Sequence, residues 1–235
     1  MCKVTYMDRN GFIAVTDKVI MVFDLYRDPS HALHKALEHN PEKPVVFFVT
    51  NYERHEKSIY ELAQDHKRVY VMSNDVLPQN VPDTVAVAGM SKGDIIEDVA
   101  GCLRVKAYGT ASKGVAFLVT DNEGHTIFHA GLLDDPIELQ GKHAEKNSEE
   151  CKTGVAINRI ASECPSIDIA FFPADTDMTS HVAKHALQFL KEIKVHYFFP
   201  IHLGTDEKTE SEYAGYAVNG AEVHYLREPG QSITL

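Results

Sequence analysis

The polar run Asn51–Ser58 carries the residue types in this chain that are most able to do chemistry. It follows the apolar run Val45–Val49, which predicts a buried strand. Apolar residues then recur at helical spacing over 59–63, so we expect a helix there. Loops at the carboxyl ends of strands face an open crevice in α/β proteins. The run offers one amide, two carboxylates and one imidazole, from Asn51, Glu53, His55 and Glu56.

Length and charge limit the classes of function. The chain has 235 residues, of which 44% are hydrophobic, so it can bury a sizeable core. No stretch has the composition of a linker, and we predict one domain over 1–235. The formal net charge is −11 and the pI is about 5.6. This acidity argues against nucleic acid and anionic membranes as partners.

The first residues, the apolar runs and the cysteines indicate the cellular compartment of the protein. Met1–Thr5 has no basic start followed by a long apolar segment, so we expect no signal peptide. No apolar run is long enough to span a bilayer. The cysteines form no CxxC pair; they are Cys2, Cys102, Cys151 and Cys164. We therefore predict reduced thiols and a cytoplasmic protein.

The order of predicted elements indicates the fold. The first half reads as a hairpin over 11–24, a helix over 32–37, strands over 45–49 and 69–72, and short strands within 78–101. The second half reads as strands over 103–108, 114–120 and 126–130, a helix over 151–161, a strand over 167–172, a helix over 182–193, and strands over 195–199, 221–226 and 232–235. We expect Val155 and Ile160 to face inward, and 133–150 to be mobile or to cover a cleft as a lid. This order predicts an α/β (α+β) fold, a four-layer αββα sandwich with two mixed sheets face to face and helices outside.

Five segments together resemble a known family. They are Phe23-Asp24, Val49-Thr50-Asn51-Tyr52-Glu53-Arg54-His55-Glu56, Ala107–Thr110 with Gly114–Phe117, Ile127–Leu132, and Phe198–His202. In this order they resemble the metallo-β-lactamase fold, in particular its small stand-alone bacterial hydrolase-like branch. The resemblance covers nearly the whole chain, and it implies a metal-dependent hydrolase.

The metal loop of that family departs from its pattern here. The family has a His-x-His-x-Asp-His motif. In the corresponding loop of this chain, the four ligand positions carry other residues. Asn51 stands for the first His and Glu53 for the second. His55 stands for the Asp and Glu56 for the adjacent His.

Two further ligand positions are also replaced. Gly109 stands where many members have a His, and Leu132 stands for the Asp that bridges two metals. Only His202 keeps the family residue. An aliphatic side chain at 132 cannot bind a metal, so a binuclear site of the family type is not expected. Without a metal-bound water, the hydrolytic mechanism of the family lacks its nucleophile.

Two interpretations of the remaining cleft stay open. Glu53, His55 and His202 could hold one zinc, manganese or iron ion in an open three-ligand site. Alternatively, these groups hydrogen-bond one another at the floor of a residual cleft and hold no metal. In either case Asp24 could orient the loop by accepting hydrogen bonds from its backbone, behind the ligands.

Other histidines have simpler explanations. Strand alternation predicts that His129 faces away from Leu132 and from the cleft, as a structural residue. His181 and His185 have the spacing of a helical metal pair, but an exposed helix face is the commoner explanation, and nothing else nearby in the sequence supports a site.

The leading hypothesis is a metallo-β-lactamase-fold protein with a largely lost binuclear site. It would be weakly active or non-catalytic, and would bind an unknown small molecule or protein partner, with a homo-oligomer as one form of association. The rival hypothesis is a hydrolase with a mononuclear site at Glu53, His55 and His202, in which Glu56 or Glu53 takes a proton. Its substrate would be an ester, lactone or phosphodiester. Fold alone does not decide between them.

Overall fold

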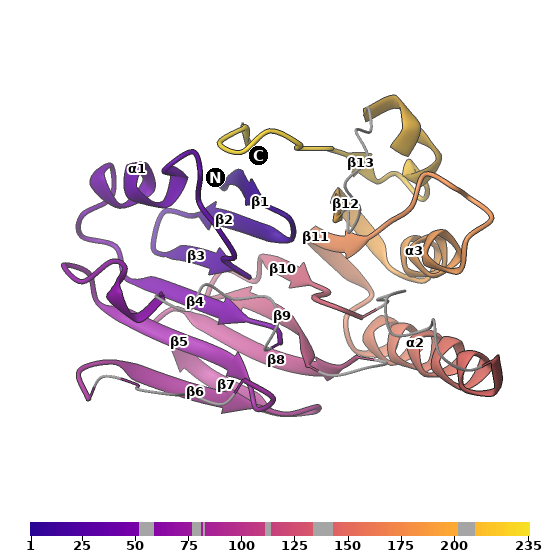
Figure 1. Cartoon of the computed structure of the whole chain (residues 1–235), viewed down its shortest axis with the longest axis horizontal. Coiled ribbons are helices and arrows are strands. Elements are labelled where there is room, and N and C mark those ends of the chain that lie inside the picture. The colour runs from indigo at the N-terminus through magenta and orange to yellow at the C-terminus, as the bar shows by residue number, and fades with distance from the viewer. Residues whose placement is uncertain (52–58, 77–80, 82, 111–113, 134–142, 202–209) are drawn as a thin grey trace.

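The computed structural model describes residues 1–51, 59–76, 81, 83–110, 114–133, 143–201 and 210–235, with 143–152 and 210 described by their backbone (Figure 1). The predicted residues Glu53, His55, Glu56 and His202 therefore lie outside the described residues, as do residues 134–142 of the polar segment 133–150. No helix in the described part is long and apolar enough to cross a membrane.

Two sheets of seven strands each form the centre of the molecule. The first sheet has the spatial order β14 (Ser232–Thr234), β1 (Lys3–Asp8), β2 (Gly11–Val15), β3 (Ile20–Phe23), β4 (Val45–Val49), β5 (Arg68–Ser73) and β6 (Ala86–Met90). The second has the order β13 (Glu222–Val223), β12 (Lys194–Ile201), β11 (Ser166–Pro173), β10 (Thr126–His129), β9 (Val115–Asp121), β8 (Leu103–Gly109) and β7 (Ile95–Val99).

Both sheets are mixed, as the sequence predicts. In the first, β14, β1, β2 and β3 pair antiparallel, and β3 to β6 pair parallel. In the second, β7 to β10 pair antiparallel, and β10 to β13 pair parallel. The predicted hairpin over 11–24 is present as β2 and β3.

Helices cover the outer face of each sheet. They are α1 (Ala32–Glu38), α2 (His143–Glu163) and α3 (His181–Glu192), with short 3₁₀ helices η2 (Ile59–Glu61) and η4 (Glu210–Tyr216). Figure 1 shows α1 beside the first sheet and α2 and α3 beside the second. The four-layer αββα sandwich is thus confirmed.

Strand β4 shows why the layers form. Its five residues are all buried, and they alternate between two cores. Val46 and Phe48 pack between the sheets, whereas Val45, Phe47 and Val49 pack in the core beneath α1. A continuous apolar run is what a strand buried on both faces requires.

The prediction of a helix over 59–63 is wrong beyond the first turn. Only η2 forms, because the carbonyl groups that would accept the next helical hydrogen bonds have other partners. Arg68 donates from Nη1 to the carbonyls of Tyr60 and Leu62, at 2.7 and 3.1 Å. The Tyr70 hydroxyl donates to the Ile59 carbonyl at 2.9 Å.

Helix α2 is longer than the predicted 151–161, and one of its residues faces the other way. Ile160 is fully buried as expected, but Val155 is 60% exposed. Thr153, Ile157 and Ile160 are spaced on one helical face and are buried against the second sheet. Val155 lies outside that face, so the prediction that it points inward is wrong.

Thr50 joins the two sheets just after β4. The Asp24 carboxylate, directly after β3, accepts from the Thr50 N–H at 2.8 Å and from the Thr50 hydroxyl at 2.7 Å. The Thr50 carbonyl accepts from the Val115 N–H of the second sheet at 2.9 Å. At Gly131, where φ is +56°, a Cβ would stand 2.6 Å from the Thr50 Cβ. The close approach of the sheets here depends on that glycine.

Glu163 joins α2 to β8. Its carboxylate accepts from Lys106 Nζ at 2.6 Å, from the Tyr108 hydroxyl at 2.8 Å and from Arg159 Nε at 3.2 Å. The hydrogen bond from Lys106, assisted by those from Tyr108 and Arg159, lowers the pKa of Glu163 from 4.5 to about 2. The carboxylate is therefore charged at neutral pH.

We expect Thr50→Val to lower the free energy of unfolding by about 1–3 kcal/mol, because the buried Asp24 carboxylate and the Asn51 amide each lose a hydroxyl partner. Thr50→Ser keeps the hydroxyl and serves as the control. Urea unfolding monitored by circular dichroism measures both. A Val variant as stable as the wild type would show that the hydroxyl contacts add nothing to the junction.

We expect the stabilisation from Glu163 to depend on pH. Because the folded-state pKa is lower than the ordinary value of 4.5, the stabilisation is present above about pH 4.5 and is lost as the pH falls toward about 2. The difference in unfolding free energy between wild type and Glu163→Gln should shrink across that window. Glu97→Gln, which removes an exposed partner of Arg104, is the control and should change little. A difference that stays constant with pH would contradict the assignment.

Candidate functional site

The predicted cleft lies where parallel strands of both sheets end. Asp24 follows β3, Asn51 follows β4, and His129 ends β10. Asp24 Oδ2 and His129 Nδ1, from opposite sheets, are 3.7 Å apart. The two sheets therefore bring these side chains together at one edge of the sandwich.

Asp24 and Asn51 are both engaged at the floor of this region. They are 1% and 2% exposed. Asn51 donates from Nδ2 to the Thr50 hydroxyl at 3.0 Å, and that hydroxyl donates to Asp24. Asp24 thus holds the start of the loop that follows β4 in place through its hydrogen bonds with Thr50. Any role of Asp24 behind metal ligands remains a prediction.

His129 is a buried histidine with both ring nitrogens in use. Nε2 lies 3.0 Å from the Asn10 carbonyl and therefore donates to it, which leaves Nδ1 to accept from the Gly131 N–H at 3.2 Å. Burial lowers the pKa of His129, so the ring is neutral. The ring stacks on Phe23 at 5.3 Å between centroids.

The expectation that His129 faces away from the cleft is wrong. It packs between the sheets beside Asp24, on the same strand face as Ile127, which belongs to the core between the sheets. Strand alternation does not extend to Leu132, because β10 ends at His129 and Gly131 turns the chain with a positive φ.

The described cleft residues do not fit a binuclear metal centre. Leu132 is 6% exposed and has no atom that can bind a metal. Gly109 has no side chain, and a Cβ there would stand 2.7 Å from Cδ of Lys92. Asn51 offers a single amide oxygen. Glu53, His55, Glu56 and His202 lie outside the described residues, so the mononuclear site remains a prediction.

One described group does gather potential metal ligands, at the other end of the strands. Asp121, Glu123 and His125, in the turn between β9 and β10, place ligand atoms within 4.8 Å of one another. His125 Nδ1 lies 3.0 Å from Asp121 Oδ2, and Lys18 Nζ lies 2.9 Å from Glu123. Asp121 also accepts from the backbone N–H groups of Glu123 and His125. These contacts account for the group as part of the hairpin turn that joins β9 to β10.

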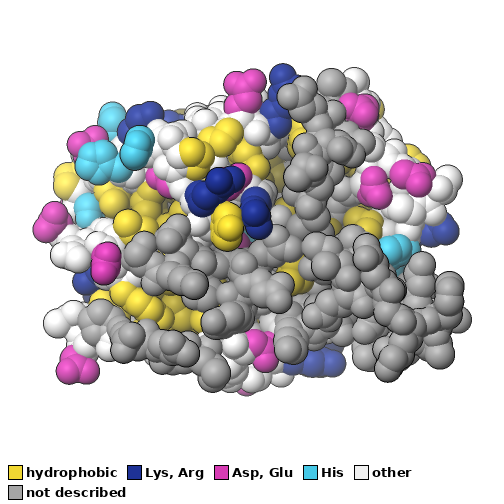
Figure 2. All heavy atoms as spheres, in the orientation of Figure 1, with side chains coloured by type: hydrophobic (Ala, Val, Ile, Leu, Met, Phe, Trp, Pro, Cys, Tyr) yellow, Lys and Arg dark blue, Asp and Glu magenta, His cyan; other side chains and the backbone are white. Residues whose placement is uncertain are grey.

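The sequence interpretation missed a cationic group beside the cleft. Arg9 and Arg27 place their guanidinium carbons 4.0 and 5.6 Å from the centre of the Tyr26 ring. Arg27 also donates to Asp8 at 2.7 Å. Figure 2 shows Lys and Arg side chains gathered over the tips of β1 and β2. Only the pairing of β1, β2 and β3 brings these turns together, and β1 was not predicted.

Asn10 adds a polar group that the sequence does not single out. It is 1% exposed, and neither atom of its side-chain amide has a hydrogen-bond partner among the described residues. Its backbone carbonyl accepts from His129. The described edge therefore offers guanidinium groups and a buried amide.

Comparison with known proteins rests on solved structures. No protein-family model matches the sequence, and no curated protein matches it. Igni18, a metallo hydrolase from the archaeon Ignicoccus hospitalis, is similar over 99% of this chain and 97% of its own, with a TM-score of 0.66 and 16% identity. YhfI from Bacillus subtilis, a metallo-β-lactamase-fold protein, is similar over 100% of both chains, with a TM-score of 0.62 and 16% identity.

A third structure carries a different chemistry on a similar framework. CmlA from Streptomyces venezuelae, a diiron β-hydroxylase, is similar over 100% of this chain and 54% of its own, with a TM-score of 0.59 and 8% identity. Identities this low show the fold and leave the activity open. Two mixed seven-stranded sheets, helices on both outer faces and these neighbours agree with the resemblance in the sequence: this chain has the metallo-β-lactamase fold.

Proposed function

We propose that this protein works without the binuclear metal centre of its fold, is weakly active or non-catalytic, and binds a small molecule or a protein partner through a residual cleft. The observation that carries the proposal is the burial of Leu132, which the resemblance in the sequence aligns with the bridging carboxylate of the family. Apolar surface there disfavours two cations that would share one ligand.

The satisfied polar groups at the cleft floor support the same proposal. Asp24 is bound to Thr50, and both nitrogens of His129 have backbone partners. His129 would have to give up a buried hydrogen bond before either of its nitrogens could bind an ion, which costs free energy. The floor is thus built to hold the sheets together.

Cations beside the cleft support ligand binding. Arg9 stacks on Tyr26, and no carboxylate partner of Arg9 lies among the described residues. A guanidinium held on an aromatic ring is well placed to bind an anionic group. We propose an unidentified anionic small molecule or an acidic protein segment as the partner, and association of two or more copies as a further form of the protein.

A second candidate function is favoured by the likeness to Igni18, a metallo hydrolase. In this alternative Glu53, His55 and His202 hold one zinc, manganese or iron ion, and the substrate is an ester, lactone or phosphodiester. We propose a cytoplasmic location in either case, supported by the free thiols of Cys2, Cys102 and Cys164.

The metal content of the protein tests the proposal. We expect protein purified without an affinity tag and dialysed against zinc, manganese or iron to retain less than about a tenth of an equivalent, because a tight site needs the right number and geometry of ligands. Elemental mass spectrometry measures it. His202→Ala should leave the metal content and the metal dependence of the melting temperature unchanged.

The opposite result identifies the hydrolase. About one equivalent retained by the wild type and lost in His202→Ala would replace the proposal with the mononuclear site. Lys184→Ala, a substitution on the exposed face of α3, controls for unspecific metal uptake.

A further inference from the structure

A pocket of about 270 Å³ lies between β8, the connection from β6 to β7, and α2. Figure 1 shows these elements together at the lower side of the molecule. The side chains that matter to its chemistry are those of Lys92, Lys106, Tyr108, Thr110, Val155 and Arg159. It shares Gly109 with the cleft, but Lys106 and Tyr108 of its lining extend to Glu163 of α2, on the outer face of the second sheet.

The lining of this pocket is cationic. Lys92, Lys106 and Arg159 contribute three positive charges, and no carboxylate is among the described lining residues. Glu163 behind the wall neutralises one of them, since it accepts from both Lys106 and Arg159. Among the side chains that the structure describes, two positive charges therefore remain uncompensated, in a chain whose formal net charge is −11.

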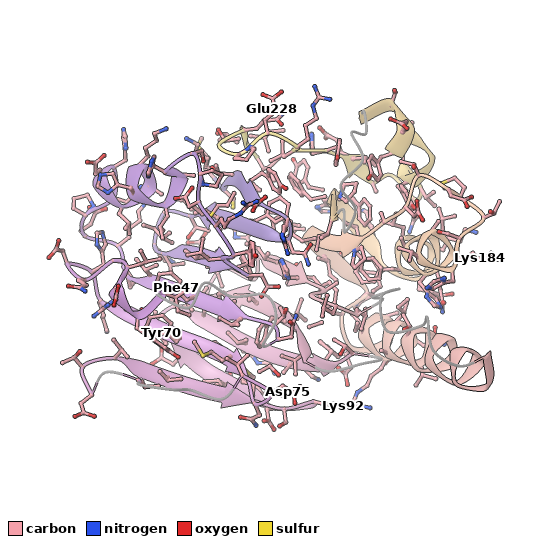
Figure 3. The ribbon with its side chains drawn as sticks, in the orientation of Figure 1. Phe47, Tyr70, Asp75, Lys92, Lys184 and Glu228 are labelled. Atoms are coloured by element: carbon pink, nitrogen blue, oxygen red, sulfur yellow. The ribbon has the colours of Figure 1, made fainter. Side chains whose placement is uncertain are left out.

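Lys92 is placed by the glycine opposite it. Its stem lies over Gly109, where a Cβ would come within 2.7 Å of Lys92 Cδ. The structure records no hydrogen bond or ion pair of the Lys92 ammonium within the described part of the chain. Figure 3 shows Lys92 at the lower edge of the molecule, far from Lys184 on α3.

The pocket also has polar and apolar contacts for a bound molecule. The Lys106 ammonium lies 5.3 Å from the Tyr108 ring centre, and the Lys106 side chain is 14% exposed, so the ammonium is held in position. The exposed Val155 and the neighbouring Ala156 form an apolar wall. An anion can therefore bind the cations while an attached carbon group covers Val155.

We propose that this pocket binds a phosphoryl dianion, either inorganic phosphate or a small phosphate monoester. Two uncompensated positive charges match a dianion, whereas a single carboxylate would leave one charge unpaired. Guanidinium and ammonium groups are the side chains that bind phosphate oxygens most strongly. This inference is independent of the proposed function, because the pocket lining contains none of the candidate metal ligands Glu53, His55 and His202.

Isothermal titration of the metal-free protein tests the pocket. The probes are inorganic phosphate, phenyl phosphate and benzoate at constant ionic strength. We expect saturable binding of both phosphates at one site per chain, with much weaker binding of benzoate. Tighter binding of phenyl phosphate than of phosphate would identify an organic monoester as the ligand, and equal binding would identify the free ion.

Four substitutions locate the site. Lys92→Met should weaken phosphate binding about fivefold, and Gly109→Ala should act in the same direction by displacing the Lys92 stem. Glu163→Gln should tighten binding, because the pocket gains an uncompensated positive charge. Lys184→Met removes an equal charge far away and should leave the affinity unchanged.

Three results would overturn the proposal. They are an absence of saturable phosphate binding, equal weakening by Lys92→Met and Lys184→Met, and weaker binding by a folded Glu163→Gln protein. Arg9→Met distinguishes the pocket from the cleft edge. Loss of phosphate binding in that variant would place the anion at the cleft edge and overturn the proposal. Circular dichroism confirms that each variant is folded.

Discussion

The junction at Thr50 is the constraint on which the rest of the structure depends. Sheets in a sandwich pack about 10 Å apart, but here a backbone crosses that distance and is held from both sides. Asp24 holds Thr50 from the first sheet, and Val115 binds its carbonyl from the second. Gly131 permits the contact because it has no Cβ. The edge of the sandwich at this point is tied by buried hydrogen bonds that an apolar core alone does not provide.

The same junction determines what chemistry the edge can support. A buried carboxylate needs partners, and Asp24 finds two of them on Thr50. A buried imidazole is kept neutral by desolvation, and His129 is held in one tautomer by backbone groups. In a hydrolase such groups would hold a water or a metal. Here Asp24 and His129 make their hydrogen bonds at the junction of the two sheets.

The sequence was sufficient for the fold, because apolar runs such as Val45–Val49 fix strands through burial on both faces. The assignment of Leu132 to the position of a bridging carboxylate remains a prediction. Side-chain direction was harder to predict. Val155 was assigned to the wrong helix face because it lies five residues before Ile160, which places the two side chains about 140° apart around the helix axis. The predicted helix after η2 fails because of Arg68 and Tyr70, which follow it in the chain and whose contacts no local pattern reveals.

Position 109 joins the loss of a metal ligand to the presence of Lys92 in the outer pocket. The sequence identifies Gly109 only as a missing His. The structure shows that the space of its absent side chain is filled by the Lys92 stem. Any residue with a Cβ there, a metal-binding His included, would displace that stem. A histidine side chain at 109 and the observed placement of Lys92 therefore exclude each other.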